Sequence, residues 1–350
     1  MRWGELLSGM GNSRRTPTLP ERGGKGEMKK YDIVGIDMPN VDLAVNLRKF
    51  PRPNGGEPIR ELSWQGGGKI ASGLVASARF GAKCAVIGAV GDDLYGEFCR
   101  DDFLRHGIDV SSLFLREGKS TGLAVVLSDE ESMGRSICFH PGTAGMVREE
   151  ELDGELLGNC RILYIAMFNE LTAKAVKLAR AKGAKILADA DYYQENVGRM
   201  IPEIDVFIGS EDMFRRLFPG REDVEACCRE IMERGPEIVV FTFGEKGCKG
   251  LSADGFFALP AFPVHAVDTV GAGDVYHGAY AAALIRGFSA EKAALYASGV
   301  SAIKCTRIGG RAGIPDFQTL ERFLSTGEID YCEIDRRVKF YENPFQNRLK

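Results

Sequence analysis

The chain has 350 residues, 44% of them hydrophobic and 27% charged, which is the balance of a soluble globular protein with a large core. Its formal net charge of −4 argues against nucleic acid or an anionic membrane as a partner, since both attract basic proteins. No stretch has the roughly 18 consecutive apolar residues that a membrane-spanning helix needs. The nine cysteines are odd in number and never spaced as a Cys-x-x-Cys pair, which favours reduced thiols in the cytoplasm. A small molecule is therefore the expected partner.

The N-terminal part of the chain contains a candidate ligand-binding carboxylate. Residues 1–27 are rich in Gly, Arg, Pro and Ser and lack the apolar core of a signal peptide, so we predict a disordered, dispensable tail before Met28. Residues 32–36 are predicted to form a short buried strand. Ligands of open α/β sheets gather beyond the carboxyl ends of the strands, which makes Asp42 a candidate acceptor of hydrogen bonds from substrate hydroxyls. The alternative is that Asp42 is a turn residue or a helix cap.

Two segments, about 43–66 and 110–140, are predicted to form a small sheet apart from the main one. The first contains several prolines and glycines and an alternating, exposed strand at 58–64. The second contains three candidate strands, at 112–116, 121–127 and 135–140. We expect these strands to pair as a small antiparallel sheet.

A glycine turn lies between these two segments and leads into a helix of small residues. Gly67 and Gly68 have no side chains, so a substrate can come close to the backbone there. Lys69 follows directly, and Ser72 lies in the first turn of the expected helix.

The middle of the chain alternates strands and helices, as a doubly wound sheet requires. Strands are predicted at 161–165, 185–189, 206–209 and 238–242, and helices at 173–182, 222–234 and 290–304. Asp189 and Asp191 close one of these strands and are expected to face the ligand crevice.

The organising stretch runs from Asp268 to Asp274 and leads straight into a predicted helix at 275–285. Its residues Gly271, Ala272 and Gly273 can present successive backbone N–H groups to an anion, and the positive end of the helix points at the same place. A carboxylate beside a bound anion is best explained as a base, which makes Asp274 the catalytic candidate. The alternative is a capped helix start, which would explain one polar residue but not the three small ones.

The sequence Asp-Thr-x-Gly-Ala-Gly-Asp of this stretch resembles the C-terminal signature of the ribokinase-like (PfkB) carbohydrate kinases. Gly67, Gly68 and Lys69 resemble the N-terminal signature, but Ile70 and Ser72 stand where Gly and a sugar-contacting Asn are usual. The resemblance covers about residues 30 to 317. It implies an α/β fold, a three-layer doubly wound mostly parallel sheet with a small β-sheet lid, in a domain spanning 28–326. Residues 327–350 are predicted to be a C-terminal tail without an assigned function.

The resemblance also implies roles for individual residues. Asp274 takes the proton of the acceptor hydroxyl, and Gly271, Ala272 and Gly273 form the anion hole. The substrate is expected to contact Asp42, Gly67, Gly68, Lys69 and Ser72, and the nucleotide to contact Thr242, Gly244, Gly247 and Gly309.

Two metal sites follow from the same resemblance. Ser210 to Met213 stands where the family has Asn-x-x-Glu, so Glu211 is a candidate for magnesium, with a helix-cap role as the alternative. Asp268 is a candidate for potassium, with a turn cap as the alternative.

The predicted function is ATP- and magnesium-dependent phosphorylation of a sugar hydroxyl. The resemblance also implies a homodimer that pairs through its lid. A nucleoside kinase of the same group is the first alternative. A non-catalytic, sugar-sensing relative is the second; Ser72 and Met213 suggest it, and the retained Asp274 argues against it. We expect a free sugar rather than a sugar phosphate, because the lid and the glycine turn offer few basic residues besides Lys69.

Overall fold

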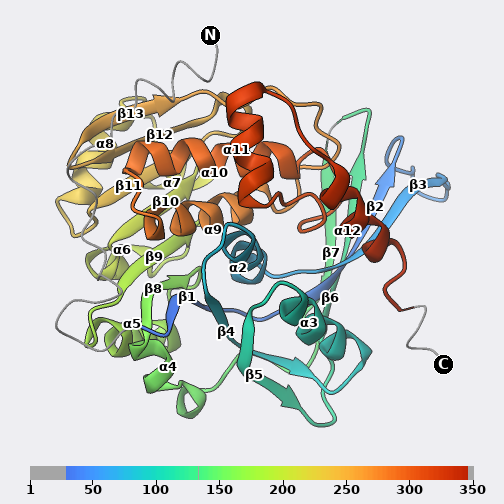
Figure 1. The fold of residues 1–350 in the computed structure, drawn as a ribbon, viewed down its shortest axis with the longest axis horizontal. Coiled ribbons are helices and arrows are strands. Elements are labelled where there is room, and N and C mark those ends of the chain that lie inside the picture. The colour runs from blue at the N-terminus through green and yellow to red at the C-terminus, as the bar shows by residue number, and fades with distance from the viewer. Residues whose placement is uncertain (1–28, 133, 346–350) are drawn as a thin grey trace.

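The computed structural model describes residues 29–132 and 134–345 as a large sheet between two layers of helices, with a smaller sheet projecting from one side (Figure 1). The predicted tail at 1–27 lies outside the described residues. In the part of the chain that is described, no helix combines the length and the apolar character that crossing a membrane requires.

The large sheet has nine strands in the order β13-β12-β11-β10-β9-β8-β1-β4-β5, parallel from β11 to β5, with β12 and β13 antiparallel at one edge. Helices cover both faces, so strands such as β8 and β11 are nearly continuous apolar runs. The strands are β1 (Tyr31–Ile36), β4 (Cys84–Gly91), β5 (Asp109–Arg116), β8 (Cys160–Ile165), β9 (Lys185–Ala190), β10 (Val206–Ser210), β11 (Ile238–Thr242), β12 (Cys248–Ser252) and β13 (Gly255–Leu259).

Two apolar cores, one on each face of the sheet, hold the helix layers. The first layer contains α2 (Lys69–Arg79), α3 (Leu94–Arg105), α9 (Ala272–Ile285), α10 (Ala290–Lys304), α11 (Phe317–Thr326) and α12 (Cys332–Glu342). The second contains α4 (Gly154–Gly158), α5 (Glu170–Arg180), α6 (Val197–Met200), α7 (Glu211–Leu217) and α8 (Val224–Met232). Three short 3₁₀ turns are η1 (Glu149–Glu151), η2 (Ile201–Glu203) and η3 (Gly244–Lys246).

The small sheet has the order β3-β2-β6-β7, formed by β2 (Asn40–Leu47), β3 (Ile59–Gly66), β6 (Gly122–Asp129) and β7 (Arg135–His140). It differs from the prediction in two ways. The central pair β2 and β6 is parallel, and residues 112–116 belong to β5, which pairs with β4 in the large sheet. β5 is an edge strand with a partly exposed face, so its alternating pattern resembles that of a lid strand.

As far as residue 345, where the described residues end, the predicted C-terminal tail is part of the domain, because α12 packs onto it and lies beside β3 (Figure 1). Ile334, Val338 and Tyr341 are buried and recur at the spacing of one helix face, a stripe that the charged composition of the segment obscures.

Helices α2 and α9 bring the two glycine-rich turns together. A Cβ atom added to Gly278 of α9 would lie 1.9 Å from the carbonyl oxygen of Gly73 in α2, so the two backbones touch. The Ser77 hydroxyl joins them further by donating to the Gly278 carbonyl at 2.8 Å. Only a side chain no larger than hydrogen permits this approach.

Candidate active site

The anion turn, residues 271–273, forms the start of α9: Ala272 and Gly273 are its first two residues, and Gly273 lies beside Asp191, just past the carboxyl end of β9. Gly271 has a φ of 71° and is the N-cap of α9, so the chain enters the helix through a left-handed residue that glycine adopts without strain. N–H groups in the first helical turn have no partners within the helix and favour negative charge. Asp274 lies in that turn.

Burial raises the pKa of Asp274 to about 7, and the negative charges of Asp189 and Asp191 act in the same direction. Lys69 opposes the shift. A general base is most effective when its pKa lies near the working pH, so the surroundings of Asp274 suit proton abstraction near neutrality.

Lys69 is held by the carboxylates that end β9. Its Nζ atom lies 2.7 Å from Oδ1 of Asp189 and 3.5 Å from Oδ2 of Asp191. The same ammonium stands over the ring of Tyr192, 4.6 Å from the ring centre. The positive charge of Lys69 is therefore largely neutralised within the site.

His277 joins this cluster from α9, although its sequence context pointed only to a structural residue. Its Nδ1 lies 2.6 Å from the Gly273 carbonyl oxygen, and its Nε2 lies 3.2 Å from the Ile208 carbonyl oxygen. Both ring nitrogens therefore face acceptors, which fits a protonated imidazole. Burial lowers the pKa of His277, but the Asp189 and Asp191 carboxylates outweigh burial and raise it above its usual value.

Asp189, Asp191 and His277 bring possible metal-ligand atoms within 4.8 Å of one another. His277 has no free lone pair when both nitrogens donate, so the carboxylates are the atoms that suit a cation. Within the described ranges, Oδ2 of Asp189 and Oδ1 of Asp191 are buried without a hydrogen-bond partner. A Cβ added to Gly273 would lie 2.6 Å from Oδ2 of Asp191, which places this carboxylate against the anion turn. Magnesium prefers such oxygen ligands, so these residues fit the ion.

The predicted acceptor residues meet at the start of α2. Asp42 is in β2, so the turn and helix-cap alternatives are wrong. Its Oδ1 accepts from Nδ2 of Asn40 at 2.6 Å and would lie 2.2 Å from a Cβ added to Gly67. Burial raises the pKa of Asp42 to about 6, against the lowering effect of Arg311. Gly68 has a φ of 98° and is the N-cap of α2.

Ser72 is buried, and its hydroxyl accepts from Nε of Arg311 at 3.3 Å. The residue that replaces the usual Asn is thus engaged by an arginine from the loop after α10. The sequence reasoning placed Arg311 in a family-like loop, residues 308–315, but assigned it no role, because its partners come from distant segments.

A cavity of about 610 Å³ adjoins the anion turn. Its walls combine three predicted nucleotide residues, two residues of the anion turn and a hydrophobic side, namely Thr242, Gly244, Gly247, Ala272, Gly273, Phe262 and Tyr276 among others. Gly309 is placed elsewhere: a Cβ there would lie 2.1 Å from Nε2 of Gln65, and its N–H donates to Asp268 at 2.8 Å.

The two predicted metal residues are both occupied by protein contacts. Glu211 lies 2.5 Å from Nη2 of Arg215 and 3.7 Å from Nζ of Lys246. The carboxylate of Asp268 accepts from the N–H groups of Val270 and Gly309 at 2.9 and 2.8 Å. The Asp268 carbonyl accepts from the fully buried Nζ of Lys304 at 2.8 Å.

Comparison with known proteins agrees with this geometry. Residues 28–316 match the family described as pfkB family carbohydrate kinase. The chain belongs to the pfkB family of carbohydrate kinases. This confirms the predicted family and makes the protein a kinase, a phosphotransferase with a hydroxyl acceptor.

Similar proteins include a nucleoside kinase of Methanothermobacter thermautotrophicus, 26% identical over 84% of this chain and 96% of its own. A 5-dehydro-2-deoxygluconokinase of Clostridium perfringens is also 26% identical, over 89% of this chain and 98% of its own. A putative ribokinase structure from Agrobacterium tumefaciens has a TM-score of 0.75 and 26% identity, covering 83% of this chain and 96% of its own. The predicted fold, a doubly wound sheet with a smaller second sheet, is therefore confirmed, as is the prediction of a sugar kinase.

Proposed function

We propose that this pfkB kinase transfers the γ-phosphoryl group of ATP to a hydroxyl of an unphosphorylated, uncharged sugar. The proposal rests on Asp274, which lies in the first turn of α9, directly after Gly273 of the cavity wall and near enough to Lys69 for their charges to interact; burial raises its pKa to about 7. The acceptor oxygen bonds to phosphorus as its proton passes to Asp274, and the bond from phosphorus to the bridging oxygen of ADP breaks. Gly271, Ala272 and Gly273 stabilise the charge on the phosphoryl oxygens.

The nucleotide and its metal are part of the same proposal. A putative ribokinase II of E. coli, which shares this fold, was solved with ATP and Mg²⁺. In this chain Asp191 would hold magnesium beside the anion turn. Glu211, the residue predicted from the sequence, is paired with Arg215. Magnesium, when bound, neutralises phosphate charge.

The charges around the glycine turn 66–68, called here the acceptor turn, favour a neutral acceptor. Lys69 is already paired with Asp189 and Asp191, so it has little positive charge to offer a second phosphate. Asp42 adds a further carboxyl at the same place. A substrate phosphate would meet net negative charge here.

One feature favours the nucleoside alternative. Tyr192, next to Lys69, is 61% exposed and offers a flat aromatic surface on which a base could stack. The two acceptor classes are separated by measuring ADP formation on a panel of free sugars, sugar phosphates and nucleosides, with acceptor-free reactions as the background. We expect the highest kcat/KM for a free sugar. A sugar phosphate in first place would overturn the proposal, and a nucleoside in first place would establish the alternative.

At Asp268, where the sequence predicts a potassium ion, the contacts favour a positive charge supplied by the protein itself. The Lys304 ammonium is fully buried against the Asp268 carbonyl, at the start of the anion turn. We propose that this ammonium supplies the positive charge there.

We also propose that two copies pair through their small sheets, in the cytoplasm. The support for pairing is apolar exposure, since Ile59, Ile137 and Phe139 of the small sheet are 52–55% exposed. The support for the compartment is the nine free cysteines, seven of them buried.

A further inference from the structure

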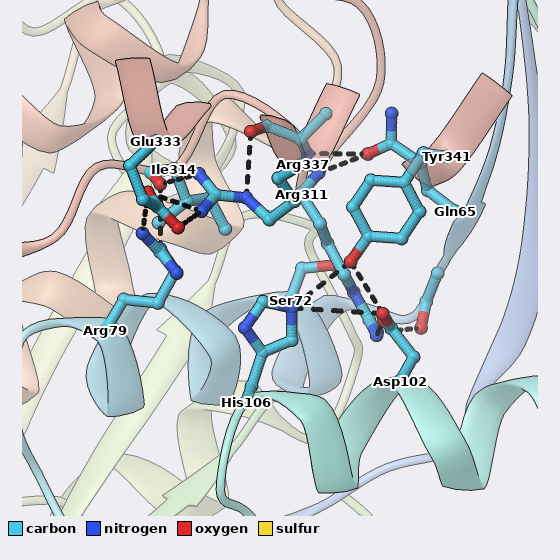
Figure 2. A network of polar contacts seen from close by, with 12 residues as sticks. Gln65, Ser72, Arg79, Asp102, His106, Arg311, Ile314, Glu333, Arg337 and Tyr341 are labelled. Atoms are coloured by element: carbon cyan, nitrogen blue, oxygen red, sulfur yellow. Dashed lines mark hydrogen bonds and ion pairs between the residues drawn. The ribbon is translucent and has the colours of Figure 1, made fainter. Parts of the chain in front are cut away.

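Helix α12, which follows the part of the chain that matches the pfkB family, turns two side chains toward the loop after α10 (Figure 2). Arg337 and Tyr341 are four residues apart and so share one face of the helix. Arg337 donates from Nε to the Ala312 carbonyl at 3.0 Å and from Nη2 to the Ile314 carbonyl. The C-terminal helix therefore holds the loop that carries Arg311.

Tyr341 acts on Arg311 through Asp102 of α3. The tyrosine hydroxyl donates to Oδ1 of Asp102 at 2.6 Å, and Nη1 of Arg311 donates to Oδ2 of the same carboxylate at 2.6 Å. All three side chains are at most 1% exposed. His106 lies 3.1 Å from the Tyr341 hydroxyl, and burial lowers its pKa to about 4, so it adds no competing charge at neutral pH.

The other side of the Arg311 guanidinium faces the acceptor turn. Nη2 donates to the Gly67 carbonyl at 2.7 Å, and Nε donates to the Ser72 hydroxyl at 3.3 Å. A Cβ added to Gly66 would lie 2.0 Å from Nη1, so the glycine backbone packs directly on the arginine. The backbone N–H of Arg311 is fixed in turn by Oε1 of Gln65 at 2.6 Å.

A turn of three glycines cannot order itself, because glycine has the greatest backbone freedom of any residue. Its conformation must come from contacts with other segments. Arg311 provides such contacts through a rigid, planar fork of donors, and a buried arginine remains in place only if its charge is paired. Asp102 pairs that charge, and Tyr341 satisfies the remaining oxygen of Asp102.

We propose that Arg311 is a positioning residue for the acceptor sugar, and that the C-terminal helix, through Tyr341 and Asp102, sets its orientation. Arg311 holds the Gly67 carbonyl and the Ser72 hydroxyl in the arrangement that receives the substrate. The inference rests on the acceptor site proposed above. It gives α12 a part in substrate recognition. The sequence does not reveal this part, because α12 lies far along the chain from both glycine-rich signature turns.

The first test is Tyr341→Phe, which removes one hydroxyl and keeps the ring. We expect the KM for the acceptor to rise about 3- to 30-fold. This range corresponds to part of the free energy of a hydrogen bond to a charged group, since the effect reaches the substrate through Arg311. The kcat should stay within about twofold, and the KM for ATP should not change, since the nucleotide cavity lies apart from the network. Acceptor binding measured by calorimetry should weaken by the same factor as KM rises.

The matched control is Tyr296→Phe. Tyr296 is another buried tyrosine whose hydroxyl donates to a carboxylate, that of Glu321, but the pair joins α10 to α11 away from the acceptor turn. It should lower the melting temperature without moving the KM for the acceptor. If both variants lose stability and neither changes that KM, Tyr341 is structural only and the proposal fails.

The second test combines Tyr341→Phe with Arg311→Lys. Lysine keeps the positive charge but cannot reach Asp102, Gly67 and Ser72 at once, so acceptor KM should rise in this variant as well. Because Tyr341 acts through Arg311, adding Tyr341→Phe to Arg311→Lys should raise acceptor KM by less than about twofold. Independent, multiplying effects would contradict the proposed route. A wild-type protein inactive on every acceptor would instead count against the proposed function.

Discussion

Among single residues, Asp274 has the charge state on which the proposed proton transfer depends. Its pKa is raised from 3.8 to about 7, first by burial and then by Asp189 and Asp191. The carboxyl must be deprotonated to accept a proton. We therefore expect kcat/KM to fall about tenfold for each pH unit below 7 and to level off above it. A profile that stays flat down to pH 5 would show that Asp274 does not titrate as the base.

The same shift has a consequence for stability. A carboxyl whose pKa is higher in the folded than in the unfolded protein costs stability as pH rises from about 4 through 7, and the full cost is present above 7. Asp274→Asn removes the charge. Its melting temperature should therefore exceed that of the parent at pH 8, and the difference should shrink toward pH 4.

Lys304 gives a third prediction at this scale. If its ammonium supplies the cation beside Asp268, activity should be equal within about twofold in potassium and potassium-free buffers of matched ionic strength. Lys304→Met should lower activity, and potassium should restore part of it. Strong stimulation of the parent protein by potassium would contradict this and support the ion predicted from the sequence.

At the scale of elements, the crossing of α2 and α9 sets the distance between the acceptor turn and the anion turn. Gly278→Ala would place a methyl group 1.9 Å from the Gly73 carbonyl oxygen and force the helices apart. We expect a loss of about 1–3 kcal/mol in the free energy of unfolding, and a fall in kcat as Asp274 moves. The control is Gly154→Ala, where the nearest atom to the new methyl is 4.0 Å away. Equal stability of the two variants by denaturant titration would refute the close crossing.

The elements also show which features of the site and the fold can be predicted from the sequence. The anion turn was predictable because its glycines and Asp274 are neighbours in the chain, and a local turn follows from local residues. His277 and Arg311 were not, because their roles come from Ile208, Asp189, Asp102 and Tyr341, which only the fold brings near. β5 was misassigned because an edge strand of a large sheet and a strand of a lid share one alternating pattern.

At the scale of the whole molecule, the exposed small sheet predicts self-association. Phe139→Asp would put a charge on a strand whose residues are all exposed, so the fold should tolerate it. We expect the parent to sediment as a dimer and the variant to shift toward the monomer. A monomeric parent at micromolar concentration would refute pairing through the small sheet, and a variant as dimeric as the parent would place the interface elsewhere.

We propose Asp274 as the base of phosphoryl transfer, and the substitution Asp274→Asn removes only its ability to accept a proton. Asparagine keeps the size of the side chain, so the fold and the affinity for ATP should be retained. The measurement is kcat with the best acceptor of the panel, taken together with ATP affinity on the same sample. We expect kcat to fall about 10²–10⁴-fold, with ATP binding unchanged or tighter. A kcat within about threefold of the parent, far short of that range, would contradict it.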